Sequence, residues 1–237
     1  MTLARIAAVA IACIVTQFAF AQNFPAKPIR LIVPFAPGGG NDVLGRMFAQ
    51  RMAESTGQSV IVDNRPGGGG NIGTELVAHG TPDGYLLLYT TNSFAIGPAL
   101  YPKLGYNIAE LAPVSLVASF PIALVTHPSL PVKTLKELVA LARSGKGLNY
   151  GSTGTGSANH LTGVLLNNMS GIANVHIPYK GAGPMMTAIL SGEIEMATPT
   201  VFTAAPYVKS GRLRAIAITS LKPSATLPGV PTVASVY

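Results

Sequence analysis

Short apolar runs alternate with amphipathic stretches along most of this chain. The run over residues 29–35 predicts a buried strand. Residues 42–55 predict a helix that has Val43, Met47 and Met52 among its apolar positions. We expect further strands at residues 60–62, 85–89, 114–117, 122–126, 148–150, 175–177, 194–197 and 213–218, and further helices at residues 72–78, 134–143, 158–169, 184–190 and 202–209.

The order of strand, glycine turn, helix and strand is typical of α/β proteins with parallel sheets. Residues 134–143 give the clearest helical period, and Thr134 with Glu137 predicts a capping box at their start. Since the pattern restarts beyond Tyr106, we expect two lobes, one over residues 22–112 and one over residues 113–218.

The first 21 residues have the three parts of a secretory leader. Arg5 is followed by an apolar stretch over residues 6–15, and an A-x-A cleavage site ends at Ala21. That stretch is too short for a membrane anchor, so we expect cleavage after Ala21 and export. The only cysteine, Cys13, lies inside the leader, and a lipid anchor there is the weaker alternative. The mature chain is therefore expected to contain no disulfide.

Composition narrows the function classes. The chain has 237 residues, of which 48% are hydrophobic and only 11% charged, as suits a globular protein rather than a disordered one. Its net charge of +7 favours anionic partners, but the basic residues are scattered and no aromatic-basic motif accompanies them. We therefore expect that the protein binds no nucleic acid. We also expect a monomer.

Common catalytic motifs are missing from the sequence. It has no P-loop lysine motif, no H-E-x-x-H and no G-x-S-x-G. Its four histidines lie far apart along the chain, without the spacing of metal ligands. We therefore expect no metal, no cofactor and no catalytic residue. An exported α/β enzyme is the least favoured hypothesis for the function.

Three glycine-rich loops each follow an expected strand and precede an expected helix. They are PGGGND at residues 37–42, PGGGGN at residues 66–71 and GSTGTGS at residues 151–157. Glycine lets backbone N–H groups approach a ligand closely, and a helix N-terminus favours an anion. Because open α/β sheets bind ligands at the carboxyl ends of their strands, we expect the first and third loops to face each other across a cleft. For the second loop we favour a simple turn.

For several side chains in and near these loops, a ligand contact and a structural role within the protein are both consistent with the sequence. Asp42 could accept a hydrogen bond from a ligand or cap its own helix. His160 could contact a ligand or pack within the protein. For Arg46 and Arg65, an ion pair within the protein is favoured over a ligand carboxylate.

A series of motifs resembles the Bug family, the periplasmic solute receptors of tripartite tricarboxylate transporters. The motifs are IVPFAPGGGND at residues 32–42 with Arg46, VDNRPGGGGNIG at 62–73, PDGY at 82–85, YGSTGTGS at 150–157 with His160, IPYKG at 177–181, GRLRA at 211–215 and LPGVPTV at 227–233. They fall in the family's order over nearly the whole mature chain, and the leader agrees with them.

The resemblance implies a two-lobed, periplasmic-binding-protein-like α/β fold that closes around a small organic carboxylate and delivers it to a membrane permease. A ligand-sensing protein for a signalling partner and a non-functional truncated receptor are the alternatives. The ligand-binding residues that it implies are Gly39, Gly40, Asn41, Asp42, Thr91, Asn92, Ser93, Ser152, Thr153, Gly154, Ser157 and His160.

The chain departs from the family pattern in three places. Asn41 replaces a more usual threonine, and residues 198–200 replace a segment that often contains aspartate. The family pattern also continues past Val233 by several tens of residues that complete the first lobe, whereas this sequence ends at Tyr237. We therefore expect residues 219–237 to return toward a first lobe that is incomplete, through either a truncated gene product or a fragmentary record.

Overall fold

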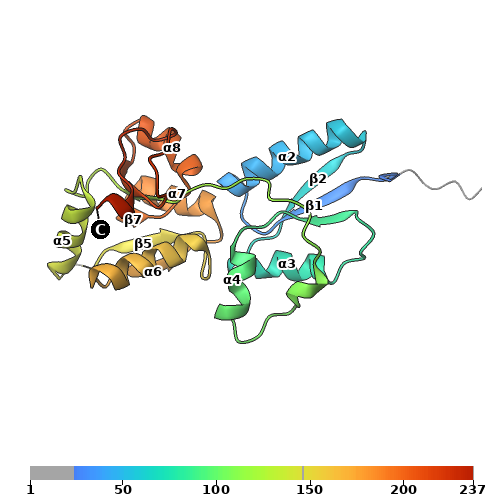
Figure 1. Cartoon of the computed structure of the whole chain (residues 1–237), viewed down its shortest axis with the longest axis horizontal. Coiled ribbons are helices and arrows are strands. Elements are labelled where there is room, and N and C mark those ends of the chain that lie inside the picture. The colour runs from blue at the N-terminus through green and yellow to red at the C-terminus, as the bar shows by residue number, and fades with distance from the viewer. Residues whose placement is uncertain (1–23, 146, 237) are drawn as a thin grey trace, which may run out of the picture.

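The computed structural model describes residues 24–145 and 147–236, which fold into two α/β lobes side by side (Figure 1). The expected leader over residues 1–21, with Cys13, lies outside the described residues. Residues 111–122 carry the chain from the first lobe to the second (Figure 1). Among the helices of the described part, none is both long and apolar enough to cross a membrane.

The first lobe is built on a parallel sheet of three strands in the order β2-β1-β3. Its central strand is buried from Leu31 to Val33, which explains its nearly continuous apolar run. The strands are β1 (Ile29–Val33), β2 (Val60–Asn64) and β3 (Leu86–Leu88), and the helices are α2 (Gly40–Thr56), η2 (Gly68–Gly70), α3 (Asn71–Ala78), α4 (Ser93–Leu100) and η3 (Ile108–Glu110).

The second lobe has a sheet of five strands in the order β6-β5-β7-β4-β8. β5 is parallel to β6 and β7, whereas β4 is antiparallel to β7 and β8, so this sheet is mixed rather than parallel. The strands are β4 (Ala123–Thr126), β5 (Asn149–Ser152), β6 (Val175–Pro178), β7 (Met196–Ala197) and β8 (Arg214–Ile218), and the helices are α5 (Leu135–Arg143), α6 (Ala158–Ser170), α7 (Ala182–Ser191), α8 (Val201–Lys209) and η4 (Val233–Ser235).

Two separate apolar cores hold the second lobe together. Met185 and Ile189 of α7 belong to one core, and Leu135 and Leu138 of α5 belong to the other. The segment 219–236, which we expected to return toward the first lobe, packs against the second lobe because its apolar side chains reach these cores. Leu227 is buried in the first of them.

One prediction of local structure was wrong, and one helix buries a face that its apolar residues do not mark. Residues 114–117 form no strand: Val114 is 88% exposed, and no strand pairs with this segment in the described chain. In α2, Val43 and Met47 are exposed, and the helix instead buries Gly45, where a Cβ would lie 3.0 Å from the side chain of Val33. Close packing of the α2 backbone on β1 therefore decides which face is buried.

Helix boundaries elsewhere follow the local chemistry. α5 begins after Thr134, whose hydroxyl accepts a hydrogen bond from the N–H of Glu137 at 3.2 Å, as expected of a capping box. The Glu137 carboxylate accepts from the N–H of Lys133 rather than from that of Thr134. Helix α4 was not predicted, because Gly97 and Pro98 interrupt its pattern.

Candidate functional site

Loops from the two lobes meet at the boundary between them. Each follows a strand and precedes a helix, after β1, β2 and β3 in the first lobe and after β5, β6 and β7 in the second. Two hydrogen bonds join the lobes here: the N–H of Ala36 donates to the carbonyl of Lys180, and the hydroxyl of Tyr101, which follows α4, donates to the carbonyl of Thr155, each at 2.9 Å. The carboxyl ends of the parallel strands β1, β2 and β3 and of β5, β6 and β7 therefore face the same region.

Glycines allow the two lobes to touch almost backbone to backbone. A Cβ on Gly183 of α7 would lie 2.7 Å from the carbonyl oxygen of Pro37 in the opposite lobe. A Cβ on Gly69 would collide with the carbonyl oxygen of Thr155, and Gly69 also has a φ of +65°. A larger residue at either position is incompatible with this arrangement of the lobes.

A cavity of about 360 Å³ lies between the lobes at these contacts. Its walls come from the loops after β1 and β2, from Tyr101, and from the loops after β5 and β6. The lining residues are Pro34, Phe35, Gly67, Gly68, Gly69, Gly70, Tyr101, Thr153, Gly154, Thr155, Pro178, Tyr179 and Lys180.

The pocket offers backbone donors and an apolar wall. Gly67, Thr153 and Thr155 line the pocket, and within the described residues their N–H groups have no hydrogen-bond partner. Two aromatic residues also line the pocket, Phe35 from the first lobe and Tyr179 from the second. Such a lining suits a small anion that has an apolar portion.

Only part of the expected site lines this pocket. Thr153 and Gly154 do, and so does the second glycine loop, which we had read as a turn. Gly39 and Gly40 instead face the N-termini of α7 and α8, where a Cβ would meet Ala182 and Thr203, respectively. The expected residues absent from the lining are Gly39, Gly40, Asn41, Asp42, Thr91, Asn92, Ser93, Ser152, Ser157 and His160.

Several of these residues support the lining loops from behind. Ser157 caps α6 and donates its hydroxyl to the carbonyl of Gly154 at 2.7 Å. Ser93 is buried, and its hydroxyl lies 2.9 Å from that of Thr91 and beside Gly70. They therefore fix the shape of the loops that line the cavity.

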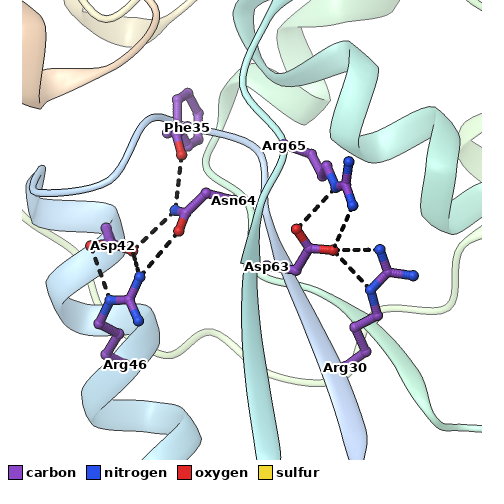
Figure 2. Close-up of polar contacts among 7 residues, drawn as sticks. All are labelled: Arg30, Phe35, Asp42, Arg46, Asp63, Asn64 and Arg65. Carbon is purple, nitrogen blue, oxygen red and sulfur yellow. Dashed lines mark hydrogen bonds and ion pairs between the residues drawn. The ribbon is translucent and has the colours of Figure 1, made fainter.

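Asp42 holds the first glycine loop through Gly38, and Figure 2 shows its contacts with Arg46 and Asn64. Its carboxylate accepts from the N–H of Gly38 and the amide of Asn64, each at 3.0 Å, and pairs with Arg46 at 3.0 Å. Burial alone would raise the pKa of Asp42, but the hydrogen bonds from Arg46, Gly38 and Asn64, with the charge of Arg46, outweigh it and lower that pKa. Both oxygens are thus used within the protein, and Arg46 has the internal partner that we favoured.

Replacing Asp42 with alanine is expected to destabilise the protein by about 2 kcal/mol, because three donors lose their charged acceptor in a buried place. Urea denaturation measures this loss. The control is Glu54→Ala, since Glu54 pairs with Arg51 on the exposed face of the same helix, and its loss should cost less than about 0.5 kcal/mol. Equal losses for the two variants would contradict a structural role of Asp42.

A second carboxylate lies on the other side of the sheet in Figure 2. Asp63 pairs with Arg30 and with Arg65, the latter at 2.9 Å. Burial would raise the pKa of Asp63, but hydrogen bonds and charges from the two arginines lower it. Arg65 is therefore engaged within the protein, as favoured from the sequence.

Ser152 and His176 form a close pair behind the third glycine loop. The hydroxyl oxygen of Ser152 lies 2.7 Å from Nε2 of His176, a distance that would suit a nucleophile and its base. Ser152 is fully buried, however, and its oxygen also accepts from the N–H of Gly154 at 3.1 Å. The pair therefore shapes the loop, and a substrate has no access to this hydroxyl.

Two histidine rings pack together at the same place. The rings of His160 and His176 lie 4.1 Å apart between centroids, and Nδ1 of His160 is 3.3 Å from the N–H of Gly156. Burial, and secondarily the charge of His160, lowers the pKa of His176 to about 4. Burial also lowers the pKa of His160. Both rings are thus neutral packing groups at neutral pH, and His160 packs within the protein.

Partial signals for the missed lining residues are present in the sequence. Pro34 and Phe35 end the first apolar run, and residues 178–180 lie in the motif IPYKG. Tyr101 follows the unpredicted helix α4, so nothing in the local pattern indicated its place. Among residues 24–145 and 147–236, no group of three or more His, Cys, Asp and Glu side chains could hold a metal ion.

Comparisons with known proteins find similar sequences and similar structures. Residues 44–237 match the family described as tripartite tricarboxylate transporter family receptor. BugT of Bordetella pertussis is 40% identical over 218 residues, which are 90% of this chain and 67% of BugT. The structure of periplasmic binding protein BugD superposes with a TM-score of 0.87 at 33% identity, covering 90% of this chain and 72% of BugD. An R. palustris protein solved with adipate gives a TM-score of 0.86 at 34% identity, with the same coverage.

Proposed function

Because the chain belongs to the tripartite tricarboxylate transporter receptor family, we propose that it binds a small organic carboxylate in the pocket between its lobes. The family and the two-lobed α/β fold are those of a solute-binding receptor rather than an enzyme. The chain spans about two thirds of the length of BugT, so the activity of the whole protein is part of this proposal.

The observation that carries the proposal is that several residues lining one cavity have unpaired backbone N–H groups. The N–H groups of Gly67, Thr153 and Thr155 belong to residues that line it, and α6 begins directly behind Ser157. Oriented N–H groups and helix N-termini stabilise a carboxylate without a cationic side chain. The R. palustris relative solved with adipate supports this ligand class.

Receptor action would follow from a change in the distance between the lobes. In the proposed cycle the lobes close over the carboxylate by hinge motion, and the closed form docks on the membrane subunits of a tripartite transporter. Export through the leader at residues 1–21 would bring the protein to the periplasm. BugD is likewise described as a periplasmic binding protein. We propose that the receptor acts as a monomer.

Thermal unfolding with a panel of mono-, di- and tricarboxylates tests the binding step. A carboxylate at 100 times its Kd is expected to stabilise the protein by about 2.7 kcal/mol, which raises the melting temperature by roughly 5–10 °C for a chain of this size. Calorimetry should give one ligand per chain, with the ligand recovered unchanged. Consumption of the ligand, or no shift with any carboxylate, would contradict the proposal.

A further inference from the structure

Positive charge is concentrated in the second lobe. Residues 22–122 contain six basic and six acidic residues, so the first lobe has no net charge. Residues 123–237 contain nine basic and three acidic residues, which gives the second lobe a net charge of +6. Ion pairs follow the same division, because the five among the described residues all lie in the first lobe. The described basic side chains of the second lobe therefore have no acidic partner within ion-pair distance.

Five of these basic residues belong to one end of the second lobe. Strand β4 runs antiparallel to β7 and β7 runs parallel to β5, so the C-terminal end of β4 lies opposite to the pocket loops that follow β5 and β6. Two connections meet the sheet at this far end: residues 127–134 lead from β4 to α5, and residues 210–213 lead from α8 to β8, which pairs with β4. Figure 1 shows α5 on the side of the second lobe that is remote from the first. We define the distal basic surface as Lys133, Lys136, Lys209, Arg212 and Arg214.

Contacts within the lobe fix the two connections that carry this surface. Nη1 of Arg214 donates to the carbonyl of Val132 at 2.7 Å, which holds the start of β8 against the connection that contains Lys133. The guanidinium of Arg212 lies 5.5 Å from the ring centre of Tyr207 in α8. Every residue of the surface except Arg214, which is half-buried, is exposed. The surface is thus a set of accessible cations on a fixed backbone.

The acidic residues of the second lobe have other partners. Each of the three carboxylates accepts a hydrogen bond from a backbone N–H or from a tyrosine hydroxyl, at 2.6–3.2 Å; the three residues are Glu137, Glu193 and Glu195. None of them forms an ion pair with a described basic side chain. Helix α5 also begins here, and the positive end of its dipole adds to the charge of the surface.

An acidic protein segment fits this surface better than a lipid bilayer does. Binding to a bilayer surface gains from apolar side chains that enter the acyl region. The large exposed apolar side chains among the described residues of the second lobe lie elsewhere, at Leu161, Leu165, Met169, Val175 and Leu221. Exposed ammonium and guanidinium groups without internal partners instead match a series of carboxylates.

From these observations we propose that the distal basic surface docks an acidic segment of a partner protein. The surface lies at the end of the second lobe opposite to the pocket, so docking leaves the pocket open and does not depend on its ligand. The proposal therefore goes beyond the proposed carboxylate binding and does not rest on it.

Fluorescence anisotropy with a labelled synthetic peptide tests the docking. The probe repeats the sequence Glu-Asp-Gly, and its neutral counterpart repeats Gln-Asn-Gly. We expect the acidic peptide to bind and the neutral one not to bind. Because salt screens exposed charges, the affinity for the acidic peptide should fall by about tenfold or more when sodium chloride is raised from about 50 to about 300 mM. Vesicles of phosphatidylglycerol and phosphatidylcholine, tested by co-sedimentation, should bind less tightly than the acidic peptide.

Two triple variants of equal charge separate this surface from general attraction. The first carries Lys136→Ser, Lys209→Ser and Arg212→Ser. The control removes three exposed basic side chains outside the surface, with Arg51→Ser, Lys103→Ser and Lys222→Ser. The first variant should bind the acidic peptide about tenfold more weakly, as expected for the loss of three exposed charge pairs, and the control should change by less than about twofold. Melting temperatures check that both variants fold.

The outcomes are decisive for the proposal. Equal weakening in the two triple variants would show attraction to the whole lobe and would overturn the assigned surface. Tighter binding to the vesicles than to the peptide would make the surface a membrane contact instead. If the acidic peptide does not bind at all, the docking proposal is wrong, whereas carboxylate binding, which is measured separately by thermal unfolding, is unaffected.

Discussion

Replacing Gly69 with alanine is expected to weaken carboxylate binding by about ten- to a hundredfold, which is roughly 1.4–2.7 kcal/mol. A Cβ at this position collides with the carbonyl oxygen of Thr155 in the other lobe. Since that oxygen belongs to the backbone and also accepts from Tyr101, it cannot move aside without disturbing the pocket. The variant should therefore favour lobes that stand further apart, and calorimetry measures the loss of affinity.

Backbone strain needs a matched control, because Gly69 has a φ of +65° and alanine there costs roughly 1–2 kcal/mol. Gly57 has a φ of +70° and no atom within 4 Å of its Cβ position, so Gly57→Ala carries the strain without the collision. It should lower stability and leave affinity unchanged. Wild-type affinity in Gly69→Ala would mean that the bound protein does not use this lobe contact.

Gly183→Ala tests the arrangement of the lobes at a second contact, which lies outside the pocket lining. Its Cβ would lie 2.7 Å from the Pro37 oxygen, yet its position in α7 favours alanine over glycine. We expect weaker binding without loss of stability. Because the substitution leaves the pocket walls intact, a weaker affinity here must come from the arrangement of the lobes.

Strand and helix positions could be predicted from the sequence wherever the local pattern agrees with the tertiary structure. The run that became β1 is apolar throughout and lies at the centre of its sheet. Residues 114–117 have the same β propensity but no neighbouring strand, and propensity alone does not form a strand. The expected two-lobed fold and the family resemblance are confirmed by the match to the receptor family and to BugD.

Side-chain roles in the site were harder to predict, because they depend on which loops meet across the lobes. The sequence shows three glycine loops but not their pairing, and the structure brings Gly69 of the second loop, not the first, against Thr155 of the third. Asp42 looks equally suited to a ligand or to the protein until Asn64, from another strand, reaches its carboxylate. The unpaired donors of the lining residues are backbone N–H groups, and the identity of a residue does not show whether its N–H is paired.

Acid is expected to destabilise the protein by roughly 2–3 kcal/mol between pH 6.5 and pH 4 through His176. Burial, and secondarily the charge of His160, lowers the pKa of His176 to about 4 from 6.5. Below pH 6.5 the unfolded chain therefore binds a proton that the folded protein does not, and folding loses about 1.4 kcal/mol per pH unit until pH 4. Partial exposure of the ring reduces the loss below the full difference between the two pKa values. Urea denaturation across this pH range measures the loss.

His176→Gln isolates this contribution, because the glutamine amide can replace Nε2 at Ser152 but does not titrate in this range. Between pH 6.5 and pH 4 the variant should lose about 2–3 kcal/mol less stability than the wild type, whereas His79→Gln, at an exposed position, should follow the wild type.

Other groups do not account for this pH dependence. The pKa values of Asp42 and Asp63 are lowered from their ordinary value of 3.8, so these groups act below the range from pH 6.5 to pH 4. The groups that face His176 are the rings of His160 and Tyr150 and the hydroxyl of Ser152, none of which carries a negative charge to stabilise the imidazolium. Equal pH dependence in His176→Gln and the wild type would therefore contradict a buried neutral imidazole behind the third glycine loop.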